Sequence, residues 1–442
     1  MTVLDRADVS TTASDGGVAA RLAAALAPVV GGDLPVRLTA WDGSVAGPTD
    51  APSVVVRSPQ ALRRILWHPG ELGAAQAYVT GELDVEGDLG AALTHVWRVA
   101  ADRGLSGVRP GPALLANLLR VAKDLGALGP PPPAPDSQAV LRGRLHTRGR
   151  DRDAIHHHYD LSNAFYALVL DPHMAYSCGY WRADDPAYTV EDAQRDKLEL
   201  VCRKVGLGSP SPDRLRFLDV GCGWGSLSLY AAERFGAQVT GVTIAAEQKR
   251  FIDERVRERG LEDRVEIRLQ DYREITGGPF DAVASLEMGE HVGQRNYRTY
   301  VKALRDSVVP GGRVLIQQMS RRGRHPGGGP FIESFIAPDM HMRPLGETVA
   351  LVESGGLEVR DVHALREHYV RTVDAWYRTF EDNWDRAVTL VGEEVARVWR
   401  LYLVGGSMAF RDGRMGVDQI LAVRPHADGR SSMPPVRLAE WS

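Results

Sequence analysis

The chain has 442 residues and a formal net charge of −4, with 53 Lys and Arg residues against 57 Asp and Glu residues. This balance argues against a protein whose whole surface is basic, so we expect no nucleic-acid partner. Cys178, Cys202 and Cys222 are too few and too scattered for a disulfide framework or a zinc cluster, which favours a reducing compartment.

The N-terminal segment, residues 1–17, is polar, rich in small residues and expected to be poorly ordered. It lacks the basic start and apolar core of a signal peptide, and no stretch approaches the ~18 apolar residues of a membrane span. We therefore predict a cytoplasmic protein that is peripheral on the inner face of the cell membrane.

Residues 18–125 predict a small α+β auxiliary domain, because helical patterns there alternate with short strand patterns. Helices are expected at 19–30, 60–67, 71–79 and 114–125, strands at 35–39 and 53–57, and a tight hairpin or turn at 81–88. The first 120 residues contain no catalytic constellation. The domain is expected to pack on the main domain or to hold a lipid chain, with plain structural support as the alternative.

A linker is predicted over residues 126–153, where the proline run 130–133 breaks regular structure. Its second half is basic, with Arg142, Arg144, Arg148, Arg150 and Arg152. Such a run could lie against anionic lipid head groups, where each basic residue contributes about 1 kcal/mol. The alternative is an ordinary solvated linker.

The main domain is predicted over residues 154–430, followed by a tail at 431–442. Strand patterns alternate with helical patterns, which is typical of an α/β fold with a mostly parallel, doubly wound sheet. The strands are expected at 216–221, 238–244, 265–269, 280–286 and 313–319, with a tight turn at 310–312 before the last of them.

The most informative stretch lies at the end of the first of these strands, where Asp219, Gly221, Gly223 and Gly225 precede a helix. Glycines between a strand and a helix let backbone N–H groups approach a ligand closely. The Asp-x-Gly-x-Gly-x-Gly spacing resembles the S-adenosylmethionine (SAM) loop of class I methyltransferases. An ordinary strand-to-helix turn is the alternative.

Further candidates end the next strands, because a doubly wound sheet binds its ligand over the carboxyl ends of the strands. Thr243 and Gln248 could donate to the ribose, Asp271 could accept from the adenine amino group, and Tyr272 could lie against the ring. Segment 285–293 would place carboxylates beside the methyl donor. The three histidines at 156–158 are adjacent, so their side chains cannot converge on one ion, and no metal is predicted.

Five motifs together resemble the cyclopropane-fatty-acid synthase family, which includes the mycolic-acid methyltransferases. They occur in colinear order between about residues 150 and 424 and are Tyr-Ser-Cys-Gly-Tyr-Trp at 176–181, Asp-Val-Gly-Cys-Gly-Trp-Gly at 219–225, Gly-Val-Thr at 241–243 with Gln248, Gln-Asp-Tyr-Arg at 270–273, and Glu-His-Val-Gly at 290–293. Residues 34–88 also resemble the small lipid-associated N-terminal domain of longer members.

The resemblance implies a class I SAM-dependent C-methyltransferase that acts on the cis double bond of an unsaturated acyl chain in a membrane phospholipid. Tyr176 and Ser177 are then expected to contact SAM. An alkene is a poor nucleophile, so the site must align it with the methyl group and exclude water. The aromatic faces of Tyr369 or Tyr176 could stabilise the resulting carbocation.

In cyclopropane synthases a bound bicarbonate takes the final proton, and the family residues that hold it match Cys178, Glu290 and Tyr369. This sequence has Gln317 where the family has histidine. A glutamine amide can donate to an anion but cannot become cationic, so proton handling changes. If the cation lives longer, a hydride shift followed by proton loss would give a methylene branch instead of a ring.

Gln317 in place of histidine and the segment 327–340 look most like the actinobacterial enzymes that make 10-methylene precursors of tuberculostearic acid. The resemblance implies SAM as cofactor, bicarbonate as a candidate second ligand, a reductase partner that saturates the product, and a homodimer as a candidate assembly. Segment 321–345 could be a lid or acyl-channel wall, or an ordinary crossover. Four aromatic residues at partly helical spacing are assigned to the core: Trp376, Phe380, Trp384 and Trp399.

Three other functions remain open. The first is a true cyclopropane synthase in which bicarbonate still binds beside Gln317. The second is an inactive module that binds SAM or lipid, and the third is a methyltransferase for a soluble small molecule. The intact Asp219, Glu290 and Tyr369 argue against the inactive module, and the apolar residues at 331–336 argue against a soluble acceptor.

Overall fold

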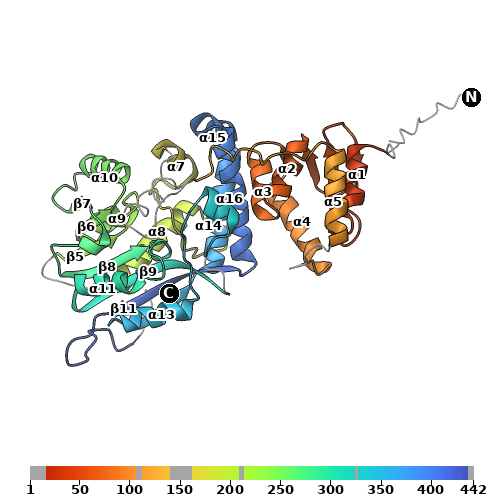
Figure 1. Cartoon of the computed structure of the whole chain (residues 1–442). Coiled ribbons are helices and arrows are strands. Elements are labelled where there is room, and N and C mark those ends of the chain that lie inside the picture. Colours follow the sequence, from red (N-terminus) through yellow and green to blue (C-terminus); the bar gives the residue numbers. More distant parts are fainter. Residues whose placement is uncertain (1–15, 106–111, 140–161, 209–213, 324–326, 437–442) are drawn as a thin grey trace, which may run out of the picture. The chain divides into compact units, whose positions relative to one another are not determined.

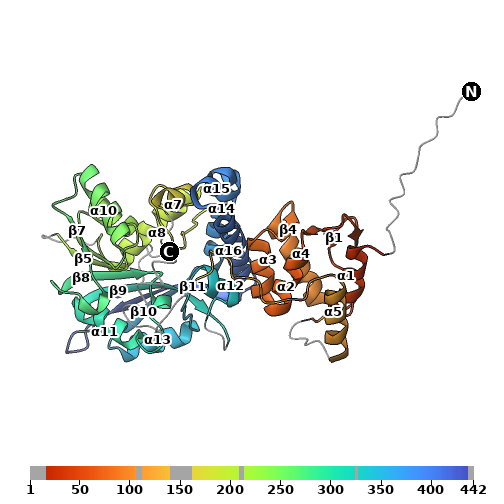
Figure 2. The same cartoon turned by 45° about the horizontal axis from the view of Figure 1, so that its top comes forward.

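The computed structural model describes residues 16–105, 112–139, 162–208, 214–323 and 327–436. The basic run at 142–152, the three histidines at 156–158 and most of the predicted N-terminal tail lie outside these residues. The chain divides into two compact units, residues Met1–Gln138 and Ala139–Ser442 (Figures 1 and 2).

The first unit contains a four-stranded sheet in the order β2-β1-β3-β4, flanked by helices. Its elements are α1 (Val18–Leu26), β1 (Arg37–Ala40), β2 (Val45–Ala46), β3 (Ser53–Val56), α2 (Pro59–Trp67), α3 (Glu71–Val79), β4 (Leu83–Glu86), α4 (Leu89–Asp102) and α5 (Pro112–Asp124). Its core joins Leu22 of α1 to Leu38 of β1, Val56 of β3 and Leu125 after α5.

The turn or hairpin predicted at 81–88 is wrong, because these residues include an edge strand. β4 pairs antiparallel with β3, with Val54 opposite Val85. The alternation of Leu83 and Val85 with acidic residues suits a sheet edge, and the flanking glycines hid this short strand in the sequence.

The second unit is built on a seven-stranded sheet in the order β10-β11-β9-β8-β5-β6-β7. Its strands are β5 (Arg216–Val220), β6 (Gln238–Thr243), β7 (Val265–Leu269), β8 (Phe280–Leu286), β9 (Val308–Arg321), β10 (Glu358–Ala364) and β11 (Met415–Val423). The five predicted strands are confirmed and are parallel to one another. β11, antiparallel to both β9 and β10, completes the sheet.

The tight turn predicted at 310–312 is wrong, because β9 runs through it. The pairing of β9 with β8 shifts its register here, so that Phe280 faces Val308 while Ala282 faces Arg313. Gly311 has φ +82° and donates its N–H to Arg424 O at 2.6 Å. The proline and glycines therefore form a bulge within the strand.

Helices cover both faces of the sheet and its carboxyl edge (Figures 1 and 2). They are α7 (Asn163–Val169), α8 (Val190–Val205), α9 (Ser226–Phe235), α10 (Ala246–Glu258), α11 (Tyr297–Ser307), α12 (Pro330–Phe335), α13 (Leu345–Ser354), α14 (Arg366–Asp382), α15 (Trp384–Val391), α16 (Glu393–Arg411) and the 3₁₀ helices η1 (Tyr272–Glu274) and η2 (Gly289–His291). α8, α9 and α10 pack on one face, and α11 and α13 on the other. α7, α14, α15 and α16 form an aromatic-rich cluster with the loop after β5 and the start of β11.

Candidate active site

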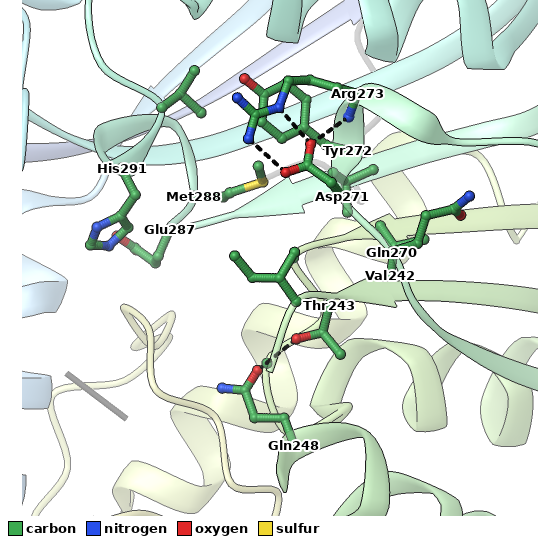
Figure 3. A pocket seen from close by; sticks show the side chains of 15 residues that line it. Val242, Thr243, Gln248, Gln270, Asp271, Tyr272, Arg273, Glu287, Met288 and His291 are labelled. Carbon is green, nitrogen blue, oxygen red and sulfur yellow. Dashed lines mark hydrogen bonds and ion pairs between the residues drawn. The ribbon is translucent and has the colours of Figure 1, made fainter. Parts of the chain in front are cut away.

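A pocket opens at the carboxyl ends of β5, β6, β7 and β8 (Figure 3). Its lining residues come from these strand ends and the loops that follow: Val220, Gly221, Gly223, Val242, Thr243, Ile244, Gln248, Gln270, Asp271, Tyr272, Arg273, Glu287, Met288, His291 and Val292. Six predicted cofactor residues are among them, Gly221, Gly223, Thr243, Gln248, Asp271 and Tyr272. The structure thus brings together residues from three separate strand ends.

The glycine loop presents backbone to this pocket. Gly221 and Gly223 have φ values of +78° and +54°, a region that L side chains rarely adopt. A Cβ at Gly221 would lie 3.2 Å from Met288 Sδ. Gly225 does not line the pocket; it caps α9 with φ +81° and packs on Ile252. The loop therefore needs its glycines for two purposes, ligand approach and helix packing.

Asp219 lies in β5 behind the loop and is buried, with 2% of its surface exposed. It accepts a hydrogen bond from Ser228 Oγ at 2.7 Å. Burial raises the pKa of Asp219 to about 6, although the Ser228 hydrogen bond acts in the opposite direction.

Two polar pairs line the other side of the pocket, as Figure 3 shows. Thr243 Oγ1 donates to Gln248 Oε1 at 2.9 Å, which directs the amide nitrogen of Gln248 to serve as a ligand donor. Asp271 accepts from Arg273 Nε at 2.7 Å and from Arg273 Nη2 at 2.6 Å. A purine amino group at Asp271 would share the carboxylate with Arg273, whose guanidinium also lies 5.1 Å from the Tyr272 ring centroid.

A second group of predicted residues lies in the aromatic-rich cluster and not in the pocket lining. Tyr176 pairs its hydroxyl with that of Tyr402 at 2.9 Å, and its ring centroid lies 5.5 Å from that of Trp376. The Tyr369 ring lies 4.5 Å from the Phe410 ring and 6.2 Å from the Trp376 ring. Trp376 thus connects two residues that were predicted to face the carbocation.

The core assignment of the aromatic residues after position 370 is confirmed for Trp376, Phe380 and Trp399, which are buried, while Trp384 is partly buried against them. Cys178 is buried in the same cluster, and its thiol donates to Gly179 O at 3.3 Å. Burial, with Glu287 as a further cause, raises the pKa of Cys178 well above its ordinary value. Cys178 is therefore a neutral thiol.

A buried carboxyl pair connects the pocket to this aromatic cluster. Glu287 lines the pocket, and Glu290, from η2, is fully buried beside it. When both are ionised, neither Glu287 Oε2 nor Glu290 Oε2 has a donor among the described residues. A single shared proton supplies the missing hydrogen bond. Burial and the neighbouring Glu287 raise the pKa of Glu290 well above its ordinary value, so the proton belongs on Glu290.

Gln317 is fixed at both ends of its amide. Its Nε2 donates to Glu287 Oε1 at 2.9 Å, and its Oε1 accepts from Gln419 Nε2 of β11 at 3.0 Å. These bonds define which end of the amide faces Glu287. Sequence reasoning identified Gln317 but missed Gln419, because β11 was not predicted as its neighbour.

Lys197 of α8 is another residue that the sequence did not single out. It is fully buried and donates from Nζ to Ser177 Oγ at 2.7 Å. Burial lowers the pKa of Lys197, while the nearby Asp171, Glu287 and Asp219 act in the opposite direction. Three residues before it, Gln194 donates to the carbonyls of Ala175 and Ser177. Two polar residues on the buried face of an otherwise amphipathic helix were the available signal.

The described residues contain no group of three His, Cys, Asp or Glu side chains placed to hold a metal ion. Within the same residues, no helix has both the length and the apolar character needed to cross a bilayer.

The sheet order, the glycine loop after the first parallel strand and the pocket beside it define a class I SAM-dependent methyltransferase. The pocket residues fit SAM, because backbone approaches at the glycine loop while Thr243, Gln248 and Asp271 offer partners for a nucleoside.

The family is shown by comparison with known proteins. A family model described as mycolic acid cyclopropane synthetase matches residues 146–420, and the chain belongs to this family. A probable fatty acid methyltransferase of Pseudomonas putida is 37% identical over 414 residues, which cover 91% of this chain and 95% of the relative. Tuberculostearic acid methyltransferase UfaA1 of Mycobacterium tuberculosis is 34% identical, with 88% of each chain covered.

A solved structure of mycolic acid cyclopropane synthase CmaA1 complexed with SAH and CTAB is similar in fold. It matches with a TM-score of 0.57 and 28% identity, over 61% of this chain and 97% of that one. The protein is therefore a SAM-dependent methyltransferase of lipid acyl chains.

Proposed function

We propose that the protein transfers a methyl group to the cis double bond of an oleoyl-type chain in a membrane phospholipid and leaves a 10-methylene branch. Bound SAM supplies an electrophilic methyl group for this reaction. The similarity to a tuberculostearic acid methyltransferase supports the branched product. The observation that carries the proposal is the fixed, uncharged amide of Gln317 at the position where the cyclopropane synthases have histidine.

The residues around the reacting carbons have two tasks after methyl transfer, to stabilise the cation and to accept its proton. The ring centroids of Tyr176 and Tyr369 lie 5.5 Å and 6.2 Å from that of Trp376. These rings provide faces for cation–π attraction, worth about 2 kcal/mol when desolvated. Because this wall is buried, water cannot trap the cation there.

Gln317 favours branching because it carries no positive charge and cannot exchange a proton. A cation that is not rapidly deprotonated to a ring can accept a hydride from the neighbouring, methyl-bearing carbon. The charge then sits on that carbon, and loss of a proton from the new methyl group forms the exocyclic double bond.

The buried apolar side chains of α12 support an acyl substrate over a soluble one, because they could form the wall of an acyl channel. Phe331 and Phe335 are both 5% exposed, with ring centroids 5.5 Å apart, and Ile336 continues the buried surface. Peripheral attachment to the inner face of the cell membrane belongs to the same proposal, because the substrate is a membrane lipid. A reductase that saturates the product and a homodimer remain predictions.

The test is turnover of SAM with purified protein and oleoyl phosphatidylglycerol vesicles, followed by ozonolysis of the released fatty acids. Formation of S-adenosylhomocysteine together with a 10-keto fragment would support the proposal. A product that adds CH₂ but resists ozone would identify a cyclopropane synthase. No S-adenosylhomocysteine would favour the inactive binding module, and turnover only with soluble acceptors would favour a small-molecule methyltransferase.

A further inference from the structure

We infer that the carboxylate of Glu287, and not a bound bicarbonate ion, takes the proton that ends the reaction. This inference rests on the proposed function, since it assigns the base for the same carbocation. Glu287 is the member of the acid pair that lines the cofactor pocket, and it also lies near Cys178 and Tyr369 on the aromatic side. It is therefore placed between the methyl donor and the predicted cation site.

Three donors surround the carboxylate of Glu287. Gln317 Nε2 donates at 2.9 Å, the Cys178 backbone N–H donates as well, and the proton on Glu290 completes the set. Burial raises the pKa of Glu287, while the hydrogen bonds from Gln317, Glu290 and the Cys178 backbone and the nearby Lys197 act in the opposite direction. A carboxylate with a raised pKa is a stronger base than an exposed one. The donors fix its orientation.

The backbone of Glu287 is strained, which is unusual for a residue at the end of a core strand. Its φ is +51°, in the left-handed region that glycine adopts without penalty. A side chain in this region destabilises the folded state, and residues with such strain cluster at functional sites. The strained backbone at Glu287 directs its carboxylate into the pocket.

The groups predicted to bind bicarbonate do not fit a second anion. The Cys178 thiol donates to Gly179 O, the Gln317 amide nitrogen donates to Glu287, and the proton of Glu290 faces Glu287. A bicarbonate ion at this place would lie beside the Glu287 carboxylate. The two negative charges would repel each other more strongly in this buried site than in water.

The proton balance closes without an added reagent. The alkene electron pair forms the new bond to the methyl carbon as the carbon–sulfur bond breaks, and S-adenosylhomocysteine leaves. After the hydride shift, Glu287 takes a proton from the new methyl group, and the electrons of that C–H bond form the exocyclic double bond. The protonated Glu287 then returns its proton to solvent through the open cofactor pocket when the products leave.

The experiment compares the wild-type protein with Glu287→Gly and Glu287→Gln. Glycine relieves the positive φ and leaves a space the size of a carboxylate, whereas glutamine fills that space without a base. Rates are measured with SAM and oleoyl phosphatidylglycerol vesicles in bicarbonate-free buffer, then with added bicarbonate or formate. SAM affinity, measured by calorimetry, and thermal melting show whether each variant is folded.

We expect the wild-type rate to change less than twofold when bicarbonate is removed. Both variants should lose about 100-fold or more in rate, the usual share of a general base. Added bicarbonate or formate should raise the rate of Glu287→Gly at least about tenfold and should not change the rate of Glu287→Gln. A wild-type rate that depends on bicarbonate, or a folded variant with full activity, would overturn the inference.

The identity of the product, together with its dependence on bicarbonate, shows which of the two proposals fails. A methylene product that requires bicarbonate would leave the proposed function intact and remove Glu287 as the base. A ring formed without bicarbonate would contradict the branched product while Glu287 kept its role. If Glu287→Gly does not fold, the wild-type dependence on bicarbonate and the Glu287→Gln rate decide the question.

Discussion

At the scale of single residues, neighbouring side chains constrain the groups that we propose to decide the product. Gln317 is held between Glu287 and Gln419, and Glu290 is a buried acid whose pKa is raised by burial and by Glu287. The identity of Gln317 was readable from the sequence, but its orientation was not, because the bond from Gln419 depends on how β11 pairs with β9.

Glu290→Met should lower turnover by about 100-fold or more, because methionine fills a similar space but has no proton to donate to the Glu287 carboxylate. Glu290 does not line the cofactor pocket, so SAM affinity should stay within about twofold of the wild-type value. S-adenosylhomocysteine release and calorimetry measure the two quantities. Unchanged turnover would remove Glu290 from the mechanism.

Asp219→Asn should stabilise the cofactor-free protein near neutral pH. The pKa of Asp219 in the folded protein, about 6, lies above its ordinary value of 3.8. The stability that this group contributes is therefore present below about pH 4 and is lost as the pH rises through about 6. This difference in pKa corresponds to a loss of at most about 3 kcal/mol in the free energy of unfolding at pH 7. Asp219→Asn should avoid this loss.

Melting temperatures of the cofactor-free wild type and Asp219→Asn between about pH 4 and pH 7 test this expectation. The advantage of the variant should grow with pH, while its affinity for SAM should fall because a predicted contact is altered. A constant difference in melting temperature across this range would show that Asp219 does not titrate as a buried carboxyl.

At the scale of elements, the glycine loop combines two functions that the sequence pattern could not separate. Gly223 lines the pocket with free space around its missing Cβ, whereas Gly225 packs its α-carbon against Ile252, 2.8 Å from the position of a Cβ. The pattern predicted the loop, but only the packing of α10 assigns each glycine its role.

Gly225→Ala and Gly223→Ala form a matched pair that tests this division. Gly225→Ala adds a clash to the strain of a positive φ and should destabilise the protein by about 3 kcal/mol. Gly223→Ala should cost only about 1 kcal/mol but weaken SAM binding, because its methyl group enters the pocket wall. Denaturant unfolding and calorimetry measure these effects. Equal losses of stability in the two variants would contradict the assignment.

The sequence predicted the strands that consist of continuous apolar runs. It missed β10 and β11, whose formation depends on pairing with distant strands. β5, β6, β8 and the middle of β9 are largely buried and read as apolar runs, while the edge strand β7 alternates buried and exposed residues. β10 is an edge strand with alternating exposure, and Asp418 and Gln419 interrupt β11 with polar residues. Those polar residues have partners in Ser320 and Gln317 of β9, which no local pattern reveals.

At the scale of the whole molecule, the candidate active site and the apolar surface that we propose for membrane contact belong to separate units. The pocket and the acid pair lie in residues Ala139–Ser442, while the first unit has its own core and several exposed large apolar side chains. In that unit Trp97 is 54% exposed, and Leu115 and Leu119 on successive turns of α5 are 47% and 43% exposed. Large exposed apolar side chains often mark membrane contacts.

The variant Trp97→Gln/Leu119→Gln should bind oleoyl phosphatidylglycerol vesicles about tenfold more weakly, because apolar area no longer enters the lipid. SAM affinity should not change, since both residues are in the first unit. Leu269→Gln is the matched control, because Leu269 is 55% exposed but lies at the end of β7 in the second unit. Vesicle sedimentation measures binding, and equal effects of the two variants would refute a membrane role for this surface.

We propose that the chain methylates an oleoyl phospholipid and leaves a branch and not a ring. Proton NMR of fatty acids made from oleoyl phosphatidylglycerol by the purified protein tests it most directly. We predict signals from the two protons of an exocyclic methylene and no upfield cyclopropyl signal. Cyclopropyl protons without a methylene signal would contradict the account, because Gln317 would then support the same ring closure as histidine.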